Sequence, residues 1–169
     1  MANKRARLGF SMLAALLASL PAVAHCDSKL PVAHAGPVAT IAAITSLLDL
    51  FAGDRLTAQA AQAVIGGAIE QQGRYWVVRS GGCIKEIVIG ATATDTPSAD
   101  VEIRFGPGST VKLGDLIAAL GPGETVFESK TASVKFELPG SGVAFARLFA
   151  SRAVPDARVL TLTLRQVPG

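Results

Sequence analysis

The stretch GPGSTVKLGDLIAALGPGETVFESKTASVKFELPG, residues 106–140, contains the change of periodicity that decides the fold. Apolar side chains recur at helical spacing through residues 111–120, and Ser109 or Thr110 can cap the start of a helix there. The glycines and proline of residues 121–123 end this helix. The first half therefore predicts a short helix with an abrupt end.

The second half of the same stretch alternates apolar and polar residues, as a strand with one wet face does. It predicts a β-hairpin of two strands, at residues 125–128 and 132–138. Val134, Phe136 and Leu138 are expected to face inward. A helix followed directly by a hairpin is therefore the unit from which the rest of the fold is built.

This unit resembles the helix-then-sheet unit of the β-lactamase-inhibitor-like and outer-membrane assembly small-lipoprotein folds. The resemblance covers Thr110 to Leu138 and is carried by the helix ending in Leu120-Gly121-Pro122 and the hairpin after it. It implies a short helix placed directly before antiparallel strands.

Upstream, two helices are expected before any strand. Residues 38–51 are almost entirely apolar and rich in alanine, which favours a buried or partner-facing helix over a strand. Residues 57–72 predict a second helix, with Thr57 as its cap. The pair Gly66-Gly67 lies in the middle of this second helix, where it permits close packing or splits the helix.

The chain then changes to β-type patterning. Residues 74–79 and 83–94 are rich in β-branched side chains, and the turn at residues 80–82 joins them as a hairpin. Residues 100–105 alternate cleanly and predict another strand with one wet face.

The end of the chain contains one clear strand and one ambiguous segment. Residues 158–166 alternate, with Leu160, Leu162 and Leu164 on one face, whereas residues 143–151 fit either a helix or a strand. A helix followed by strands occurs twice, first from residue 57 and again from residue 110, which suggests tandem α+β units.

The fold class predicted is α+β. We expect N-terminal helices followed by an antiparallel sheet, with a short helix inserted before a β-hairpin. Residues 38–169 would form a single domain, and residues 25–37 a flexible N-terminal segment.

The N-terminus predicts export. Basic residues precede an apolar run, Leu8–Leu20, which Pro21 interrupts before an A-x-A site ending at Ala24. Residues 1–24 are therefore expected to be a cleaved signal peptide, and the protein to be periplasmic or secreted. The run is too short for a membrane-spanning helix, which needs about 20 apolar residues. We expect no membrane span in the mature chain.

Removal of the leader changes the charge balance. Three of the 16 basic residues lie in the leader, which leaves 13 basic residues against 13 acidic ones in the rest of the chain. A neutral chain without a basic cluster lacks the electrostatic attraction on which nucleic-acid binding depends. Nucleic acid is therefore not an expected partner.

The two cysteines, Cys26 and Cys83, are expected to form a disulfide, because pairing is usual in an oxidising compartment. Closing this loop would stabilise the fold by about 4 kcal/mol if unfolded-chain entropy alone is counted. A lipid anchor at Cys26 is not expected, because His25 occupies the position where a lipobox has a small residue.

Two short motifs suggest catalytic or metal-binding alternatives. Cleavage after Ala24 would place His25 first, where its amine and ring, with His34, resemble the copper brace of secreted copper proteins. Ser109 and Lys112 match the S-x-x-K motif of serine β-lactamases and penicillin-binding proteins, but the chain is too short for their two-subdomain cleft. We assign no catalytic, cofactor-binding or metal-binding residues, and no cofactor.

A binding role is therefore favoured over an enzyme. The sequence predicts an exported, non-enzymatic domain that binds another protein, of inhibitor, immunity or envelope-assembly type. Tyr75 and Trp76 are the predicted contact residues, because such side chains dominate interface energetics. The alternative is a small envelope enzyme or metal- or ligand-binding protein that uses His25.

Overall fold

The computed structural model describes residues 36–121, 123–138 and 142–167. In chain order the elements are α1 (Pro37–Ala52), α2 (Ala58–Ile65), β1 (Ala68–Gln72), β2 (Tyr75–Arg79), β3 (Ile84–Ile89), β4 (Asp100–Phe105), α3 (Leu113–Leu120), β5 (Glu124–Glu128), β6 (Thr131–Leu138), β7 (Gly142–Ala150) and β8 (Val159–Val167). The mixed α+β class is thus confirmed.

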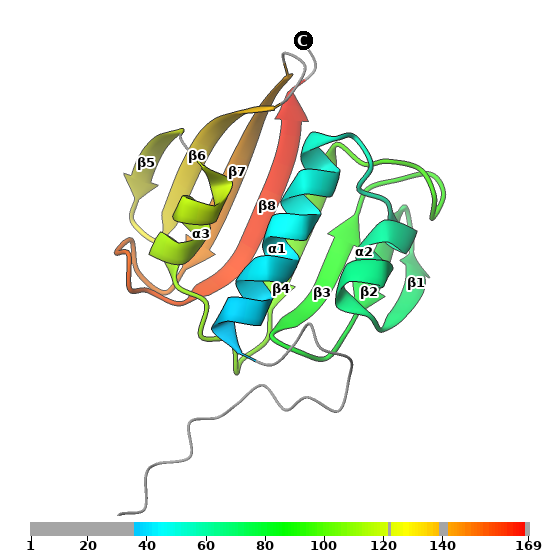
Figure 1. The fold of residues 1–169 in the computed structure, drawn as a ribbon, viewed down its shortest axis with the longest axis horizontal. Coiled ribbons are helices and arrows are strands. Elements are labelled where there is room, and N and C mark those ends of the chain that lie inside the picture. Colours follow the sequence, from blue (N-terminus) through cyan, green and yellow to red (C-terminus); the bar gives the residue numbers. More distant parts are fainter. Residues whose placement is uncertain (1–35, 122, 139–141, 168–169) are drawn as a thin grey trace, which may run out of the picture.

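All eight strands belong to one antiparallel sheet in the order β1-β2-β3-β4-β8-β7-β6-β5. The three helices lie side by side on one face of this sheet, with α1 along the middle strands, α2 near β2 and α3 near β6 (Figure 1). We call the opposite side of the sheet the open face, since no helix of the described residues covers it.

The core lies between the helices and the sheet. Val101 and Ile103 of β4 lie opposite Leu164 and Leu162 of β8, and all four are fully buried. They form part of one apolar cluster with the buried side of α1, including Phe51. Because alternate residues of a strand point to opposite faces, the intervening residues of β4 and β8 lie on the open face.

The sheet contains two similar halves related by an approximate two-fold axis between β4 and β8. Each half consists of an eight-residue helix followed by four antiparallel strands, and the strand order reads the same from both edges. The β4–β8 register is consistent with this axis. A two-fold rotation about the pair Glu102–Thr163 exchanges the pair Val101–Leu164 with the pair Ile103–Leu162. The tandem units suggested by the sequence are therefore present as repeated structure.

A left-handed glycine ends the short helix of each half. Gly66 follows α2 with φ 71° and ψ −167°, and Gly121 follows α3 with φ 83° and ψ −168°. A second glycine follows in each half and lies close to the neighbouring strand. A Cβ atom on Gly67 would overlap the carbonyl oxygen of Arg79 in β2, and a Cβ atom on Gly123 would overlap that of Lys135 in β6. The same local device turns helix into strand in both halves.

The predicted helix at residues 57–72 is wrong in its second half. Thr57 caps α2 as expected, its Oγ1 accepting from Ala60 N at 3.0 Å, but the helix ends at Ile65. Residues 68–72 form β1, because Gly66 and Gly67 redirect the chain so that it can pair with β2. Pairing with the next strand in a hairpin overrides the helical preference of the alanines and glutamines here.

Two further expectations are corrected, and the alternative left open for residues 143–151 is resolved. Neither Ser109 nor Thr110 caps α3, since its N-cap is Lys112, which makes no side-chain cap. The ambiguous residues 143–151 belong mostly to the strand β7. Leu160 is 42% exposed although Leu162 and Leu164 are buried, because an irregularity between Phe149 and Ala150 shifts the β7–β8 register.

Candidate functional site

The open face is an array of side chains whose neighbours follow from the strand register. One row across the sheet runs through Gln72, Tyr75, Gly90, Asp100, Arg165, Phe145, Lys135 and Glu124. The next runs through Glu70, Val77, Val88, Glu102, Thr163, Arg147, Ser133 and Val126. The third runs through Ala68, Arg79, Glu86, Arg104, Thr161, Phe149, Thr131 and Glu128.

The β1–β4 half of this face is covered by ion pairs that neutralise one another. Glu86, which is almost completely buried, lies 2.7 Å from Arg104 and 3.5 Å from Arg79. Arg104 also lies 2.6 Å from Glu102, and Arg79 lies 3.2 Å from Glu70. The hydrogen bonds that Arg104 donates to Glu102 and Glu86 raise the pKa of Arg104 further above its usual value. The charges of this half are satisfied within the molecule.

The β5–β8 half is different, because it exposes aromatic side chains. Phe145 and Phe149 of β7 are 43% and 39% exposed, and Val126 of β5 is 48% exposed. Arg147 lies between the two phenylalanines on the same face, with its guanidinium carbon 5.1 Å from the centre of the Phe149 ring. The strand thus presents an aromatic, a cation and an aromatic in succession.

The strands on both sides of β7 contribute only cations and hydroxyls to this part of the open face. We call the following set the β7 patch: Phe145, Arg147 and Phe149 with Lys135, Ser133 and Thr131 of β6 and Arg165, Thr163 and Thr161 of β8. Two acidic residues lie one strand further out: Asp100 of β4 pairs with Arg165 at 3.2 Å, and Glu124 of β5 lies opposite Lys135. Among the described residues Arg147 makes no ion pair.

The two halves of the sheet provide an internal comparison for the β7 patch. The pair Trp76–Ile89 of β2 and β3 corresponds to Ala132–Leu148 of β6 and β7. Counting along the strands from these pairs places Glu86 where the other half has Phe145. In the same way Val88 corresponds to Arg147, and Gly90 to Phe149. One half of the fold forms without exposed phenylalanines, so the architecture itself does not require them.

The predicted contact residues, Tyr75 and Trp76, lie on opposite faces of β2. The ring of Tyr75 is on the open face, where Arg74 donates to its hydroxyl at 2.7 Å and lies 5.0 Å from the ring centre. Trp76 is on the helix side, partly buried against the core. The structure therefore leaves Tyr75 accessible for a partner and gives Trp76 a packing role.

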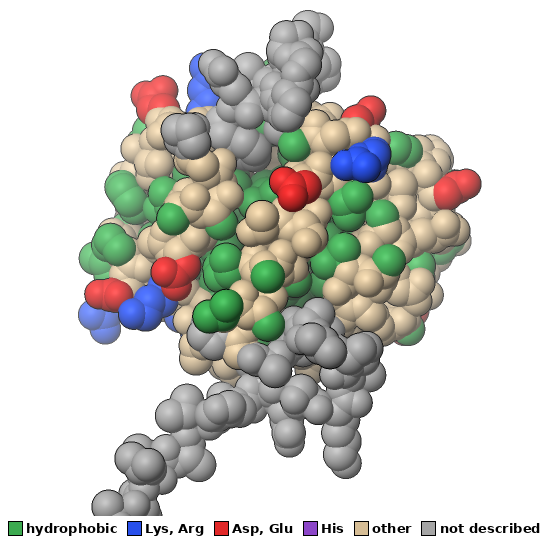
Figure 2. All heavy atoms as spheres, viewed as in Figure 1, with side chains coloured by type: hydrophobic (Ala, Val, Ile, Leu, Met, Phe, Trp, Pro, Cys, Tyr) green, Lys and Arg blue, Asp and Glu red, His purple; other side chains and the backbone are tan. Residues whose placement is uncertain are grey.

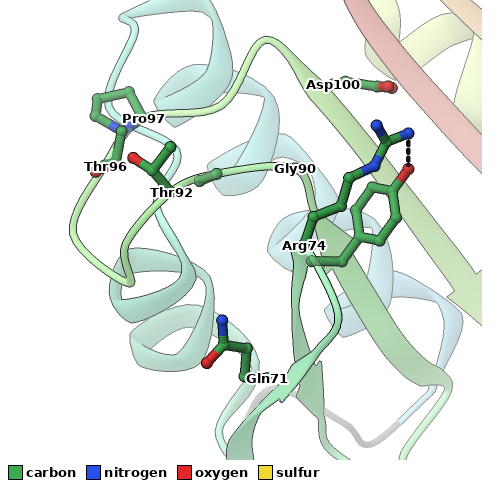
Figure 3. A pocket seen from close by; sticks show the side chains of 9 residues that line it. Gln71, Arg74, Gly90, Thr92, Thr96, Pro97 and Asp100 are labelled. Atoms are coloured by element: carbon green, nitrogen blue, oxygen red, sulfur yellow. Dashed lines mark hydrogen bonds between the residues drawn. The ribbon is translucent and has the colours of Figure 1, made fainter.

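Tyr75 also borders an open hollow of about 660 Å³ between the β1–β2 hairpin and the β3–β4 loop. Figure 3 shows Thr92, Thr96 and Pro97 on the loop side of this hollow, opposite Arg74. Its charged groups are already engaged, since Arg74 contacts Tyr75 and Asp100 pairs with Arg165. The hollow contains no pairing of a nucleophile with a base among the described residues that line it.

The S-x-x-K match has no catalytic geometry. Ser109 is buried, and its hydroxyl oxygen accepts a long hydrogen bond from Val111 N at 3.4 Å. Lys112 donates to Asp156 at 2.9 Å, and this contact raises the pKa of Lys112. A lysine held in its charged form is the opposite of the neutral base that would activate a serine.

The N-terminal candidates lie largely beyond the described part of the chain. His25, Cys26 and His34 are outside it, while Cys83 is buried beside the start of β3 and is disulfide-bonded. The described residues include no cluster of three or more His, Cys, Asp or Glu side chains that could bind a metal. They also include no helix with the length and hydropathy to cross a membrane.

The helix side carries a second apolar feature. Val38 and Ile41 of α1 and Ala118 and Ala119 of α3 line a groove of about 490 Å³. Val38 at its end is 83% exposed. Figure 2 shows apolar side chains scattered over this side of the molecule with few charges between them.

Comparison with known proteins adds no assignment: no protein-family model, curated protein or solved structure matches this chain.

The residues of the β7 patch were not found from the sequence, since residues 143–151 fitted a helix as well as a strand. The signal is nevertheless present in VAFARLF, residues 143–149. If this segment is taken as a strand, Phe145, Arg147 and Phe149 necessarily share one face. Their partners on β6 and β8 follow only from the sheet register.

Proposed function

We propose that this protein is an exported, non-enzymatic domain that binds another protein through the β5–β8 half of its open face. The observation that carries the proposal is the exposure of Phe145 and Phe149 on a sheet whose other half has Glu86 and Gly90 at the corresponding positions. Exposed apolar side chains grouped on one surface are typical of protein-binding sites, where aromatic residues and arginine contribute most of the affinity.

Several features support the location outside the cytoplasm. The leader of residues 1–24 has the organisation of a signal peptide. The bonded state of Cys83 fits an oxidising compartment, and we propose Cys26 as its partner because the sequence contains only two cysteines. This bond would connect the residues before α1 to the start of β3.

The binding surface is tested by comparing two opposite sides of the molecule. The chain from residue 25, with its disulfide oxidised, is immobilised and exposed to envelope extract of the source organism. Each captured protein is then purified, and its Kd for the chain is measured by calorimetry. The same measurement is made with the double variant F145S/F149S and with Val38→Ser, which removes an even more exposed apolar side chain from the helix side.

We expect F145S/F149S to weaken binding at least tenfold and Val38→Ser to leave the Kd unchanged. Both variants should keep the wild-type far-UV circular dichroism, because the substituted side chains are exposed. A captured partner whose affinity falls with Val38→Ser but not with F145S/F149S would show that the helix side is the binding surface and would refute the proposal.

A further inference from the structure

We infer that the segment recognised by the β7 patch is acidic, with a carboxylate that pairs with Arg147 between apolar side chains that cover Phe145 and Phe149. This inference rests on the proposed function and specifies the chemistry of the partner. It is carried by three features of the patch: its charge, the placement of Arg147, and the contrast with the other half of the sheet.

The charge of the patch is unbalanced. Lys135, Arg147 and Arg165 are its ionised side chains, and of these Arg165 is neutralised by Asp100 at 3.2 Å. Lys135 lies opposite Glu124 across the β5–β6 pair, and Arg147 lies opposite the hydroxyl residues Ser133 and Thr163. The central cation therefore has hydroxyl groups, and not carboxylates, as its cross-strand neighbours.

The opposite half shows how this sheet treats its own cations. Arg79 contacts Glu70 and Glu86 on its two neighbouring strands, and Arg104 contacts Glu86 on the neighbouring strand and Glu102 on its own strand. If Arg147 served only to stabilise the sheet, a carboxylate on β6 or β8 would be the simplest partner for it. The residues directly opposite Arg147 on β6 and β8 are instead Ser133 and Thr163, so the position for an acidic group over Arg147 is left to a binding partner.

The guanidinium of Arg147 is already oriented for such a group. Its position over the Phe149 ring restricts the side chain, which lowers the entropy lost when a carboxylate binds. Arginine donates two parallel N–H groups to a carboxylate, and this pairing gains strength when apolar groups exclude water around it. Covering Phe145 and Phe149 would exclude water on both sides of Arg147.

The spacing defines the shape of the expected segment. Residues two apart on one face of a strand are separated by about 6.6–6.8 Å. Phe145, Arg147 and Phe149 therefore form a column about 13 Å long, which matches an extended segment of the form apolar-x-acidic-x-apolar. Ser133, Thr161 and Thr163 beside the column offer hydroxyl groups to the backbone or polar side chains of this segment.

A nucleic acid fits this surface less well. Aromatic side chains on a sheet can stack on bases, but single-strand binding also needs a basic groove that follows the phosphate backbone. Here Asp100, Glu102, Glu124 and Glu128 border the β7 patch on both sides. These carboxylates would repel a phosphate chain that extended beyond the patch.

The test uses a display library of random 12-residue peptides selected against the oxidised chain from residue 25. Selected peptides are synthesised, and their Kd values are measured for the wild type, for F145S/F149S and for Arg147→Glu. Arg55→Glu, which reverses an exposed charge next to α1, is the matched control. A fluorescent oligomer of twelve deoxythymidines is measured with the same proteins.

We expect the selected peptides to be enriched in Asp or Glu with apolar residues two positions away on either side. Arg147→Glu should weaken their binding at least tenfold, and Arg55→Glu should leave it unchanged. Selection against Arg147→Glu itself should yield basic peptides, because the central charge is then reversed.

The other outcomes separate this inference from the proposed function. Peptides that require Phe145 and Phe149 but carry no acidic residue, or bind Arg147→Glu equally well, overturn the inference and leave the protein-binding proposal intact. Peptides that bind F145S/F149S as well as the wild type refute both. Arg147-dependent binding of the deoxythymidine oligomer that is tighter than that of every selected peptide overturns the acidic-peptide inference in favour of a nucleic acid.

Discussion

The close approach of Gly67 to β2 makes a quantitative prediction about stability. Gly67 has φ +90°, and a Cβ atom placed on it would overlap the carbonyl oxygen of Arg79 and lie 2.9 Å from Cα of Ser80. Gly67→Ala therefore combines two penalties, a left-handed backbone and a steric overlap with the neighbouring strand. Gly66→Ala is the matched control, because Gly66 has φ +71° but open space around its Cβ position.

The two penalties can be estimated separately. Gly66 has ψ −167°, and a residue other than glycine with positive φ and ψ near 180° costs about 1–3 kcal/mol. Overpacking against a fixed neighbour adds about 1–3 kcal/mol. Gly66→Ala should therefore lower the free energy of unfolding by about 1–3 kcal/mol, and Gly67→Ala by about 2–6 kcal/mol. Gly123, whose φ is not in the left-handed region but whose Cβ would overlap the carbonyl oxygen of Lys135, should show the overlap penalty alone.

Urea denaturation followed by circular dichroism measures these differences from the midpoint and slope of each transition. The decisive comparison is between Gly67→Ala and Gly66→Ala. If the two variants lose the same stability, the backbone conformation accounts for the whole effect. The argument that Gly67 is needed for the close approach of β1 to β2 would then be wrong.

Three further predictions concern local features. Thr57→Ala should lower the free energy of unfolding by about 1 kcal/mol through loss of the α2 cap. Thr110→Ala should change it by less than about 0.5 kcal/mol, since Thr110 caps no helix. Equal urea midpoints for the two variants would contradict this prediction. Glu86→Gln should lower the free energy of unfolding by about 1–2 kcal/mol at low salt, after allowance for the half-exposed arginines, and Glu70→Gln, at a more exposed position, by less than about 1 kcal/mol. Both losses should shrink as salt is added. A larger loss for Glu70→Gln would show that burial of Glu86 does not matter. Reduction of the predicted disulfide should lower the free energy of unfolding by up to about 4 kcal/mol, and an intact mass identical before and after reduction would exclude the bond.

The local sequence pattern was sufficient to predict segments that keep, in the folded protein, the secondary structure that their own residues favour. The strand at residues 100–105 matches β4, and the helix at residues 38–51 matches α1 within one residue at each end. The alternation of residues 100–105 is typical of a strand, and the length and alanine content of residues 38–51 are typical of a helix. Residues 68–72 were predicted as helix because alanine and glutamine favour it, and only the partner strand β2 makes them a strand.

The candidate site depended on tertiary structure for a similar reason. Residues 143–149 are compatible with either period, and only pairing with both β6 and β8 makes them a strand. Tyr75 and Trp76 were both selected as contacts by residue type, but the pleat of β2 places only Tyr75 on the open face. Which face a residue occupies follows from period two, but which face is covered depends on where the helices pack.

The sequence by itself determined the mixed α+β class and the positions of most strands, and it predicts an export leader at residues 1–24 that leaves a chain of balanced charge. These properties depend on composition and on contacts between residues close in sequence. The tertiary structure alone decided that β4 pairs with β8, that two similar halves form one sheet, and that Arg147 lies between two phenylalanines with Ser133 and Thr163 directly opposite it on the adjacent strands. Those properties depend on pairing between distant segments, which no local pattern specifies.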